Sequence, residues 1–254
     1  MMNIFYSVRA LVLLSVVFTS CVSTKKATYF NNLRDTLLVN TTAIPESVIQ
    51  VNDILNISVS SMNPEASSIY NAPNEFKGDA NSPTGYLVDQ HGNIQFPILK
   101  NIKAAGLSKE QLRTVITNSL LEKKLLIDPI VSIRFQNFRV TVLGEVARPT
   151  VVSVPSEKIS LLEALGFAGD LTVYAKRDNV LVIREEGGQK MIKRINLNSQ
   201  ELFNSEYYYL KSNDIVYVEP NKAKIASVSR TQQWLPVVIS ALTLGIFVVD
   251  RLVK

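Results

Sequence analysis

The chain has 254 residues, a formal net charge of +5, one cysteine and one histidine. A single cysteine excludes a disulfide framework within the chain, and a single histidine leaves no second one for a histidine metal site. The positive charge is not gathered into a basic run with interleaved aromatic residues, so the sequence predicts no nucleic-acid partner. It also predicts no metal and no cofactor.

The N-terminus has the pattern of a secretory signal peptide. One charge, Arg9, precedes a nearly unbroken apolar run at 10–18, and two small residues follow it. The run is shorter than the roughly 20 residues that a membrane-crossing helix needs, so residues 1–20 are predicted to be a signal that is removed. The sequence FTSC, which ends at Cys21, resembles the bacterial lipobox. That resemblance implies that the Cys21 thiol carries a lipid; a buried, inert cysteine is the alternative.

A polar linker is predicted over 21–48, followed by a first folded domain over 49–136. Apolar and polar residues alternate in VNDILNISVSS, which predicts a strand with one buried face. The stretch 62–84 has three prolines and little periodicity, and is predicted to be an exposed loop. GYLVDQHGNIQFP then predicts a hairpin, in whose turn Gly92 takes a positive φ and His91 faces solvent.

A helix and a strand complete the first domain, and a further strand follows. Ser108 with Gln111 three residues later is a capping box, which marks the N-terminus of a helix. This helix is predicted to bury one face, made of Leu112, Val115, Ile116 and Leu120. Strands are predicted at 131–135 and from Arg139 onward.

A second domain is predicted over 137–222. Ser160 with Glu163 forms another capping box, at the start of a short helix that ends at one of the following glycines. Two extended runs meet at Gly187-Gly188, which predicts a hairpin, and YYYLKSNDIVYVEP predicts a last strand. A small sheet that embraces one short helix is the β-grasp arrangement, so the predicted fold class is α+β.

The C-terminal region, 231–254, is predicted to be a membrane helix. Its stretch 234–249 has no charge and would span about 24 Å at 1.5 Å per residue. On a helical wheel, one polar stripe gathers the candidate pore-lining residues Gln233, Ser240, Thr243 and Asp250. Ala241 and Gly245, four residues apart, are candidate packing positions for a neighbouring helix. The alternative is a single anchor whose Ser and Thr hydroxyls bond to carbonyls of the same helix.

Several long stretches of the sequence carry a family resemblance. They are VNDILNISV, GYLVDQHGNIQFPIL, AAGLSKEQL, DPIVSIRFQNFRVTVLGEVARP, ISLLEALGFAGDLTVYAKRDNVLVIRE and YYYLKSNDIVYVEPN. In these, the chain resembles the polysaccharide export family, the Wza-type outer-membrane exporters, over about 49–221. Lys100 and Thr150 stand where that family has glycine.

The resemblance implies a polysaccharide export domain at 49–136 and a soluble-ligand-binding β-grasp domain at 137–222. It implies an outer-membrane lipoprotein with soluble domains in the periplasm, whose copies form a ring-shaped channel for capsular polysaccharide or exopolysaccharide. The implied partners are polysaccharide, membrane lipid, further copies of the chain, and an inner-membrane polysaccharide copolymerase or tyrosine autokinase. The family role needs a path and no catalysis, so no catalytic residue is predicted.

The aromatic run Tyr207, Tyr208 and Tyr209 is a candidate glycan contact. Aromatic rings can cover the apolar faces of sugars while the tyrosine hydroxyls bond outward. In a strand the three would alternate, so that Tyr208 points away from its two neighbours. Packing within the sheet is the alternative.

Two other functions remain open. An envelope enzyme that acts on glycans could use Asp89 with Glu145 or Asp170 with Glu163, but nothing in the sequence sets either pair at the spacing of a glycosidase. An envelope secretion or adhesion scaffold lipoprotein with a β-grasp ligand-binding module is the stronger alternative.

Overall fold

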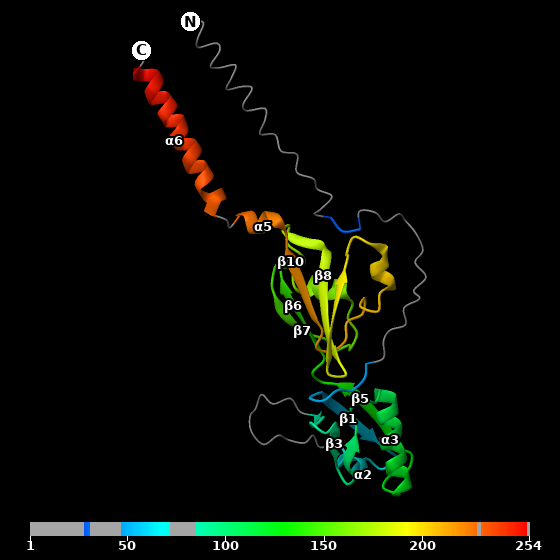
Figure 1. Ribbon diagram of the computed structural model, residues 1–254. Helices are drawn as coiled ribbons and strands as arrows, with labels where there is room; N and C mark the ends of the chain where they lie inside the picture. Colours follow the sequence, from blue (N-terminus) through cyan, green and yellow to red (C-terminus); the bar gives the residue numbers. More distant parts are fainter. Residues whose placement is uncertain (1–27, 31–46, 72–84, 228–229, 253–254) are drawn as a thin grey trace.

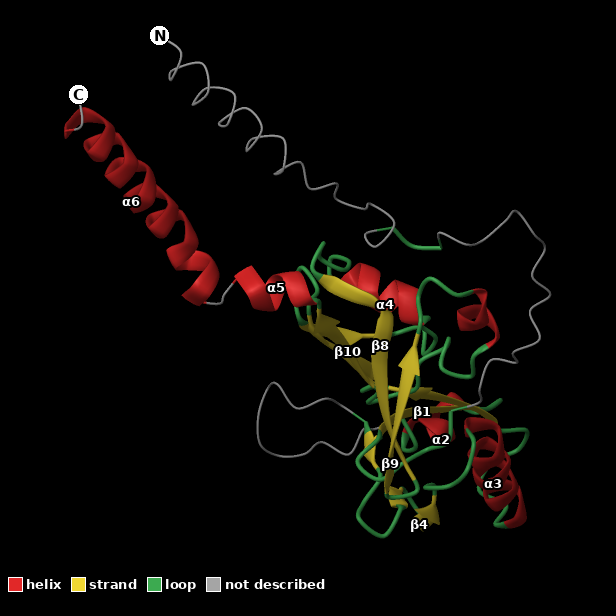
Figure 2. Ribbon diagram, turned by 45° about the horizontal axis from the view of Figure 1, so that its top comes forward, coloured by secondary structure: helices red, strands yellow, loops and turns green. Residues whose placement is uncertain are grey.

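The computed structural model describes residues 28–30, 47–71, 85–227 and 230–252. They form two sheet-containing domains in chain order, followed by two helices that lead away from the second domain (Figure 1). Figure 2, turned by 45°, shows the C-terminal helix again pointing away from both sheets. Cys21 and the predicted signal peptide lie outside the described residues, as does most of the predicted linker.

The first domain is built around a three-stranded antiparallel sheet in the order β2-β1-β5, with a separate hairpin, β3-β4. Its elements are β1 (Ile54–Ser60), α2 (Pro64–Ser68), β2 (Tyr86–Leu87), β3 (Asn93–Phe96), β4 (Lys100–Lys103), α3 (Lys109–Glu122) and β5 (Ile130–Phe135). Leu55, Ile57 and Val59 of β1 are buried, as the alternation predicts.

Three aromatic rings pack at the centre of this domain. Tyr70 stacks on Phe96 with ring centroids 5.8 Å apart, and Tyr86 tilts against Phe96 at 5.3 Å. The buried Tyr86 hydroxyl donates to the backbone oxygen of Tyr70 at 2.7 Å, so its polar end is satisfied. The cluster joins β2, β3 and the segment after α2 into one core.

Helix α3 begins at the predicted capping box. The Ser108 hydroxyl accepts from the Gln111 backbone N–H at 3.3 Å, and the Gln111 side chain accepts from the Ser108 N–H at 2.9 Å. The helix packs against β5. Its buried face consists of Leu112, Ile116 and Leu120, whereas Val115 is 40% exposed, so the prediction that Val115 belongs to this face is wrong. The buried side chains follow the strict four-residue spacing of one helix face.

The predicted loop 62–84 contains a short helix, α2. Asn63 precedes it, and its side-chain oxygen accepts from the N–H groups of Glu65 and Ala66 at 3.1 and 3.2 Å. This N-cap supports a single helical turn inside a sequence that has no helical period. Residues 72–84 lie outside the described part of the chain.

The hairpin predicted from GYLVDQHGNIQFP is partly wrong. Its turn is present, because Gly92 has φ 78° and the Asp89 carboxylate accepts from the N–H groups of His91 and Asn93, and His91 is exposed. The flanking strands do not pair with each other, however, since β2 pairs with β1 and β3 pairs with β4. Lys100 at the start of β4 has φ 62°, a conformation that glycine adopts at less cost.

The second domain is a five-stranded mixed sheet in the order β7-β6-β10-β8-β9. Its elements are β6 (Arg139–Gly144), β7 (Thr150–Ser153), α4 (Leu161–Phe167), β8 (Ala175–Glu186), β9 (Gln189–Ile195), the 3-10 helix η2 (Gln200–Asn204) and β10 (Ile215–Pro220). Strand β10 runs parallel to β6 and antiparallel to β8. The sheet with its one short α-helix confirms the predicted α+β class for the folded domains.

Local signals in this domain are confirmed. Helix α4 starts at the Ser160–Glu163 capping box, and β8 and β9 meet at Gly187-Gly188, both with positive φ, as a two-residue hairpin turn requires. Gly144, at the end of β6, has φ 91°, and a Cβ there would lie 2.1 Å from the Val218 carbonyl oxygen. The close parallel pairing of β6 and β10 therefore depends on a glycine at this position.

A charged contact joins the two domains beside the short connection from β5 to β6. Glu157, in the loop between β7 and α4, pairs with Lys109 at the start of α3, and its other oxygen accepts from the Phe135 N–H at 2.6 Å. Asn137, within the connection, bonds the Ile54 N–H at 2.9 Å and the Asn52 carbonyl at 3.1 Å. The Glu157 bonds cross from the second domain to the first, and the Asn137 bonds hold the connection to the first domain, so both restrain the joint.

The C-terminal prediction is wrong. The chain forms α5 (Lys222–Ser227) and the 23-residue α6 (Arg230–Leu252), but no helix within the described residues is both long and apolar enough to cross a membrane. The uncharged stretch at 234–249 gives only about 24 Å of helix, against a hydrocarbon core of about 30 Å. The folded domains keep the α+β class, but its predicted transmembrane helix is wrong.

Asp53 is a buried carboxyl group in the turn before β1. It is 2% exposed, and Oδ2 accepts from the Gln50 N–H at 2.7 Å. Burial raises the pKa of Asp53 to about 6, and the Gln50 hydrogen bond only partly opposes this. The folded state thus holds a proton that the unfolded chain, with a pKa of about 4, releases more easily.

We expect Asp53→Asn to remove a pH dependence of stability. Because the folded-state pKa is raised, protonated Asp53 stabilises the fold below about pH 4, and this contribution is lost as the pH rises to about 6. The variant should gain about 2 kcal/mol in unfolding free energy over the wild type at pH 7.5, and little at pH 4. Urea unfolding at both values measures this, with the exposed Asp178→Asn as control. Equal pH profiles for wild type and Asp53→Asn would contradict it.

Candidate functional site

The predicted tyrosines lie in a turn of the second domain. Residues 199–209 form η2 and the turn that follows it, before β10 begins. The Tyr207 N–H donates to the Ser205 hydroxyl at 3.2 Å and the Tyr208 N–H to the Ser205 carbonyl at 2.9 Å. Because these bonds close a turn, the expected strand alternation of the three tyrosines is wrong.

A buried ion pair positions this turn. Arg184 lies on the inward face of β8, in line with Val180 and Val182, and is 4% exposed. Its Nε and Nη2 donate to Oδ1 and Oδ2 of Asp214, which is 1% exposed, at 3.0 and 2.6 Å. Such a bidentate pair fixes direction as well as distance, so β8 is held to the segment that precedes β10.

The same guanidinium holds two of the predicted tyrosines. Arg184 Nη2 donates to the Tyr209 carbonyl at 3.3 Å, and the guanidinium carbon lies 4.7 Å from the ring centroid of Tyr207. Tyr207 is buried beneath it, whereas Tyr208 and Tyr209 are half-buried. Burial raises the pKa of the Tyr208 hydroxyl, so this group remains a neutral donor at neutral pH.

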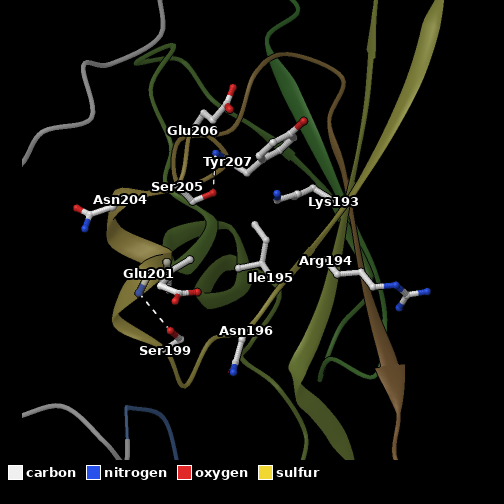
Figure 3. A pocket seen from close by; sticks show the side chains of 11 residues that line it. Lys193, Arg194, Ile195, Asn196, Ser199, Glu201, Asn204, Ser205, Glu206 and Tyr207 are labelled. Atoms are coloured by element: carbon white, nitrogen blue, oxygen red, sulfur yellow. Dashed lines mark hydrogen bonds between the residues drawn. The ribbon is translucent and has the colours of Figure 1, made fainter.

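A polar pocket of about 290 Å³ opens on one side of this turn (Figure 3). Its walls are strand β9 with its exit, and η2 with the turn after it. The lining residues are Lys193, Arg194, Ile195, Asn196, Ser199, Glu201, Leu202, Asn204, Ser205, Glu206 and Tyr207. Hydroxyl, amide, ammonium and carboxylate groups thus surround one space, which is the chemistry that binds a ligand rich in hydroxyls.

The charged side chains of the pocket differ in whether they already bond another side chain. Arg194 points away from it in Figure 3 and bonds Asn179 and Glu219 at 2.9 and 3.1 Å. Lys193, its neighbour on the strand, points toward Tyr207 instead, as alternation requires. Among the described residues no ion pair joins Lys193 to Glu201 or Glu206. These three charges remain open to a ligand.

Half-buried aromatic rings form a row on the same segment. Phe203 of η2 lies 5.6 Å from Tyr208 between ring centroids, and Tyr208 lies 5.0 Å from Tyr209. The Lys158 ammonium sits 4.9 Å from the Tyr209 ring centroid. The structure therefore brings the predicted tyrosines together with Phe203, Lys158 and Lys193, which the sequence analysis missed because their contacts cross distant parts of the chain.

The other predicted site residues do not join this surface. In α6 the Ser240 hydroxyl donates to the Pro236 carbonyl at 2.8 Å, and the Thr243 hydroxyl to the Ile239 carbonyl at 2.9 Å. Both bonds stay within the helix. Ala241 and Gly245 are exposed, and nothing lies within 4 Å of a Cβ built at Gly245. The side chains of Gln233 and Asp250 lie outside the described residues.

Two family matches cover both folded domains. Residues 41–136 match the family described as polysaccharide biosynthesis/export protein, and residues 139–194 match the SLBB domain. The chain is thus built from an export domain followed by an SLBB domain. It belongs to the polysaccharide export family, whose members include the Wza-type exporters.

Two curated relatives share this region. The EPS I polysaccharide export outer membrane protein EpsA of Ralstonia solanacearum is 32% identical over 158 residues, which are 61% of this chain and 41% of that protein. The protein of the same description from Ralstonia nicotianae is 32% identical over 145 residues, or 56% and 37% of the two chains. The matched region thus spans about two fifths of the length of each relative.

We expect Arg184→Met to destabilise the second domain by about 3 to 5 kcal/mol, because it leaves the buried Asp214 carboxylate without its charged partner and with only the Lys211 N–H as a donor. The matched control is Lys190→Met on the same hairpin, whose ion pair with Glu185 is exposed and should change stability by less than about 1 kcal/mol. Denaturant unfolding compares the two. The double variant Arg184→Met with Asp214→Leu should recover much of the loss. Equal costs for the two single variants would contradict the role of the pair.

Proposed function

We propose that the protein exports an exopolysaccharide across the outer membrane as a ring-shaped homo-oligomer. The observation that carries this proposal is the order of an export domain and an SLBB domain in one chain, the part shared with relatives described as outer-membrane polysaccharide export proteins. In this role the folded domains lie in the periplasm, and a lipid on Cys21 anchors the chain. The relatives' description favours exopolysaccharide over capsular polysaccharide.

The exposed edges of the second sheet support a ring. Strands β7 and β9 are its two edges, and each leaves one row of backbone groups outside the sheet. Two different surfaces of one chain can pair with neighbouring copies head to tail, which closes into a ring where the rotation allows. Ile192 of β9 and Val151 of β7 add exposed apolar side chains at these edges, at 62% and 56% exposure.

The pocket and the aromatic row suit transport rather than catalysis. A polysaccharide offers hydroxyl groups to the pocket and apolar sugar faces to Tyr208, Tyr209 and Phe203. Export then needs a partner that delivers the polymer, and the resemblance points to an inner-membrane polysaccharide copolymerase or tyrosine autokinase. The protein would act as a transport protein, with binding groups that release the polymer as readily as they take it.

We expect a pocket variant to impair export without loss of the protein. Asn196→Ala with Asn204→Ala removes two amides that line the pocket, of which the Asn196 oxygen also accepts from the Asn198 N–H at 2.9 Å, and should lower secreted polysaccharide several-fold. Secreted and periplasmic polysaccharide are measured in cells that lack the chromosomal copy, and the variant's level is checked in isolated envelopes. The control is Asn101→Ala on the β3-β4 hairpin of the first domain, which should export normally. Normal secretion by cells that lack the chain altogether would refute the proposed function.

We expect Cys21→Ser to prevent lipid attachment. Without acyl chains, which contribute about 0.8 kcal/mol per buried methylene, the chain should leave the outer-membrane fraction. Intact-mass spectrometry and membrane fractionation measure this, with the partly exposed Ser61→Ala as control. A wild-type mature chain that begins elsewhere and carries no acyl mass would count against the anchor.

A further inference from the structure

Three residues from the predicted linker lie on the second domain. Thr28, Tyr29 and Phe30, here called the strap, are drawn in blue in Figure 1, beside the second domain and far from the first. The Tyr29 hydroxyl donates to Oδ1 of Asp170, 141 residues later. The Arg177 guanidinium lies 5.4 Å from the Tyr29 ring centroid. The Tyr29 side chain of the strap is therefore held both at its hydroxyl and at its ring.

The second ring of the strap extends the aromatic row. Phe30 stacks on Phe203 with ring centroids 5.5 Å apart and an angle of 27° between the planes, and Phe203 leads on to Tyr208 and Tyr209. A stacked ring occupies one face of its partner. A sugar that used this face of Phe203 would have to displace Phe30, so strap and saccharide compete for it.

The docked strap leaves one buried group unsatisfied. Arg177 is 5% exposed, and its terminal nitrogens donate to the carbonyls of Ala175 and Thr172 at 3.5 and 3.2 Å, but its Nε has no hydrogen-bond partner within the part of the chain that the structure describes. A buried unpaired donor costs about 1 to 3 kcal/mol. Release of the strap would take away the Tyr29 ring that lies against Arg177 and let water or a ligand oxygen reach the guanidinium. The unpaired Arg177 Nε thus raises the free energy of the docked state, and release of the strap would remove this cost.

We propose that the strap is a releasable cover over a saccharide-binding surface made of Phe203, Tyr208, Tyr209 and Arg177. The sugar faces would stack on the rings, and a hydroxyl or carboxylate oxygen would accept from Arg177. This inference rests on the proposed function, because that function supplies the saccharide. It adds that the chain blocks part of its own binding surface until a polymer displaces the strap.

Binding of an oligosaccharide to the full chain tests the cover. The probe is a set of oligosaccharides cut from the polysaccharide that the producing cells secrete, titrated calorimetrically into the purified protein. Phe30→Ala should tighten binding about three- to ten-fold, since it removes the competing ring. Phe203→Ala should weaken binding at least ten-fold, since it removes the shared surface. Tyr174→Ala, an exposed ring of the same domain that lies near Lys224 instead, should leave binding unchanged.

Docking is measured separately from binding. Backbone hydrogen exchange at Leu171, whose N–H donates to the same Asp170 oxygen as the Tyr29 hydroxyl, should quicken in Tyr29→Phe and Phe30→Ala. The cover is overturned if Phe30→Ala binds as the wild type does, or more weakly. It is also overturned if no variant binds the oligosaccharides while the cells still need the chain for export, and in that case the proposed function stands.

Discussion

The buried Arg184–Asp214 pair is the constraint on which the second domain's surface depends. The Arg184 guanidinium donates to the Asp214 carboxylate and to the Tyr209 carbonyl oxygen, and it covers the Tyr207 ring. Two strands and the turn between the pocket and the aromatic row are therefore fixed by one side chain. A hydrophobic pair could supply similar stability, but it could not specify the direction of three groups at once.

Specific hydrogen bonds and an ion pair also restrain the joint between the two domains. Glu157 reaches from the second domain to Lys109 and the Phe135 N–H, while Asn137 bonds the backbone on both sides of Asp53. A connection of only three residues separates β5 from β6, so the two sheets have little room to swing independently. In the proposed ring, this would keep the pockets of successive copies at one height along the path of the polymer.

Local signals in the sequence predicted local structure well. The capping boxes at Ser108 and Ser160 and the turn at Gly187-Gly188 involve neighbours within four residues, and all three are confirmed. Contacts between distant residues were missed. Strand β3 pairs with β4 across a short turn, after which Lys100 has a positive φ. Arg184 forms an ion pair with Asp214, which lies thirty residues later in the chain. The strand predicted for the three tyrosines was wrong for a related reason. The Ser205 hydroxyl accepts from the Tyr207 N–H and closes a turn, where the aromatic residues alone suggested a strand.

A path for a polymer needs contacts that are numerous and individually weak, since strong binding at any point would stop movement. The surface around residues 199–209 has this character. Its pocket mixes Lys193 with Glu201 and Glu206, so it lacks the single strong charge that would trap an ionic group. Its rings are half-buried, and offer faces rather than an enclosed cavity. The strap fits the same requirement, because a covering ring that must be displaced lowers the net affinity of the surface without altering the groups that bind.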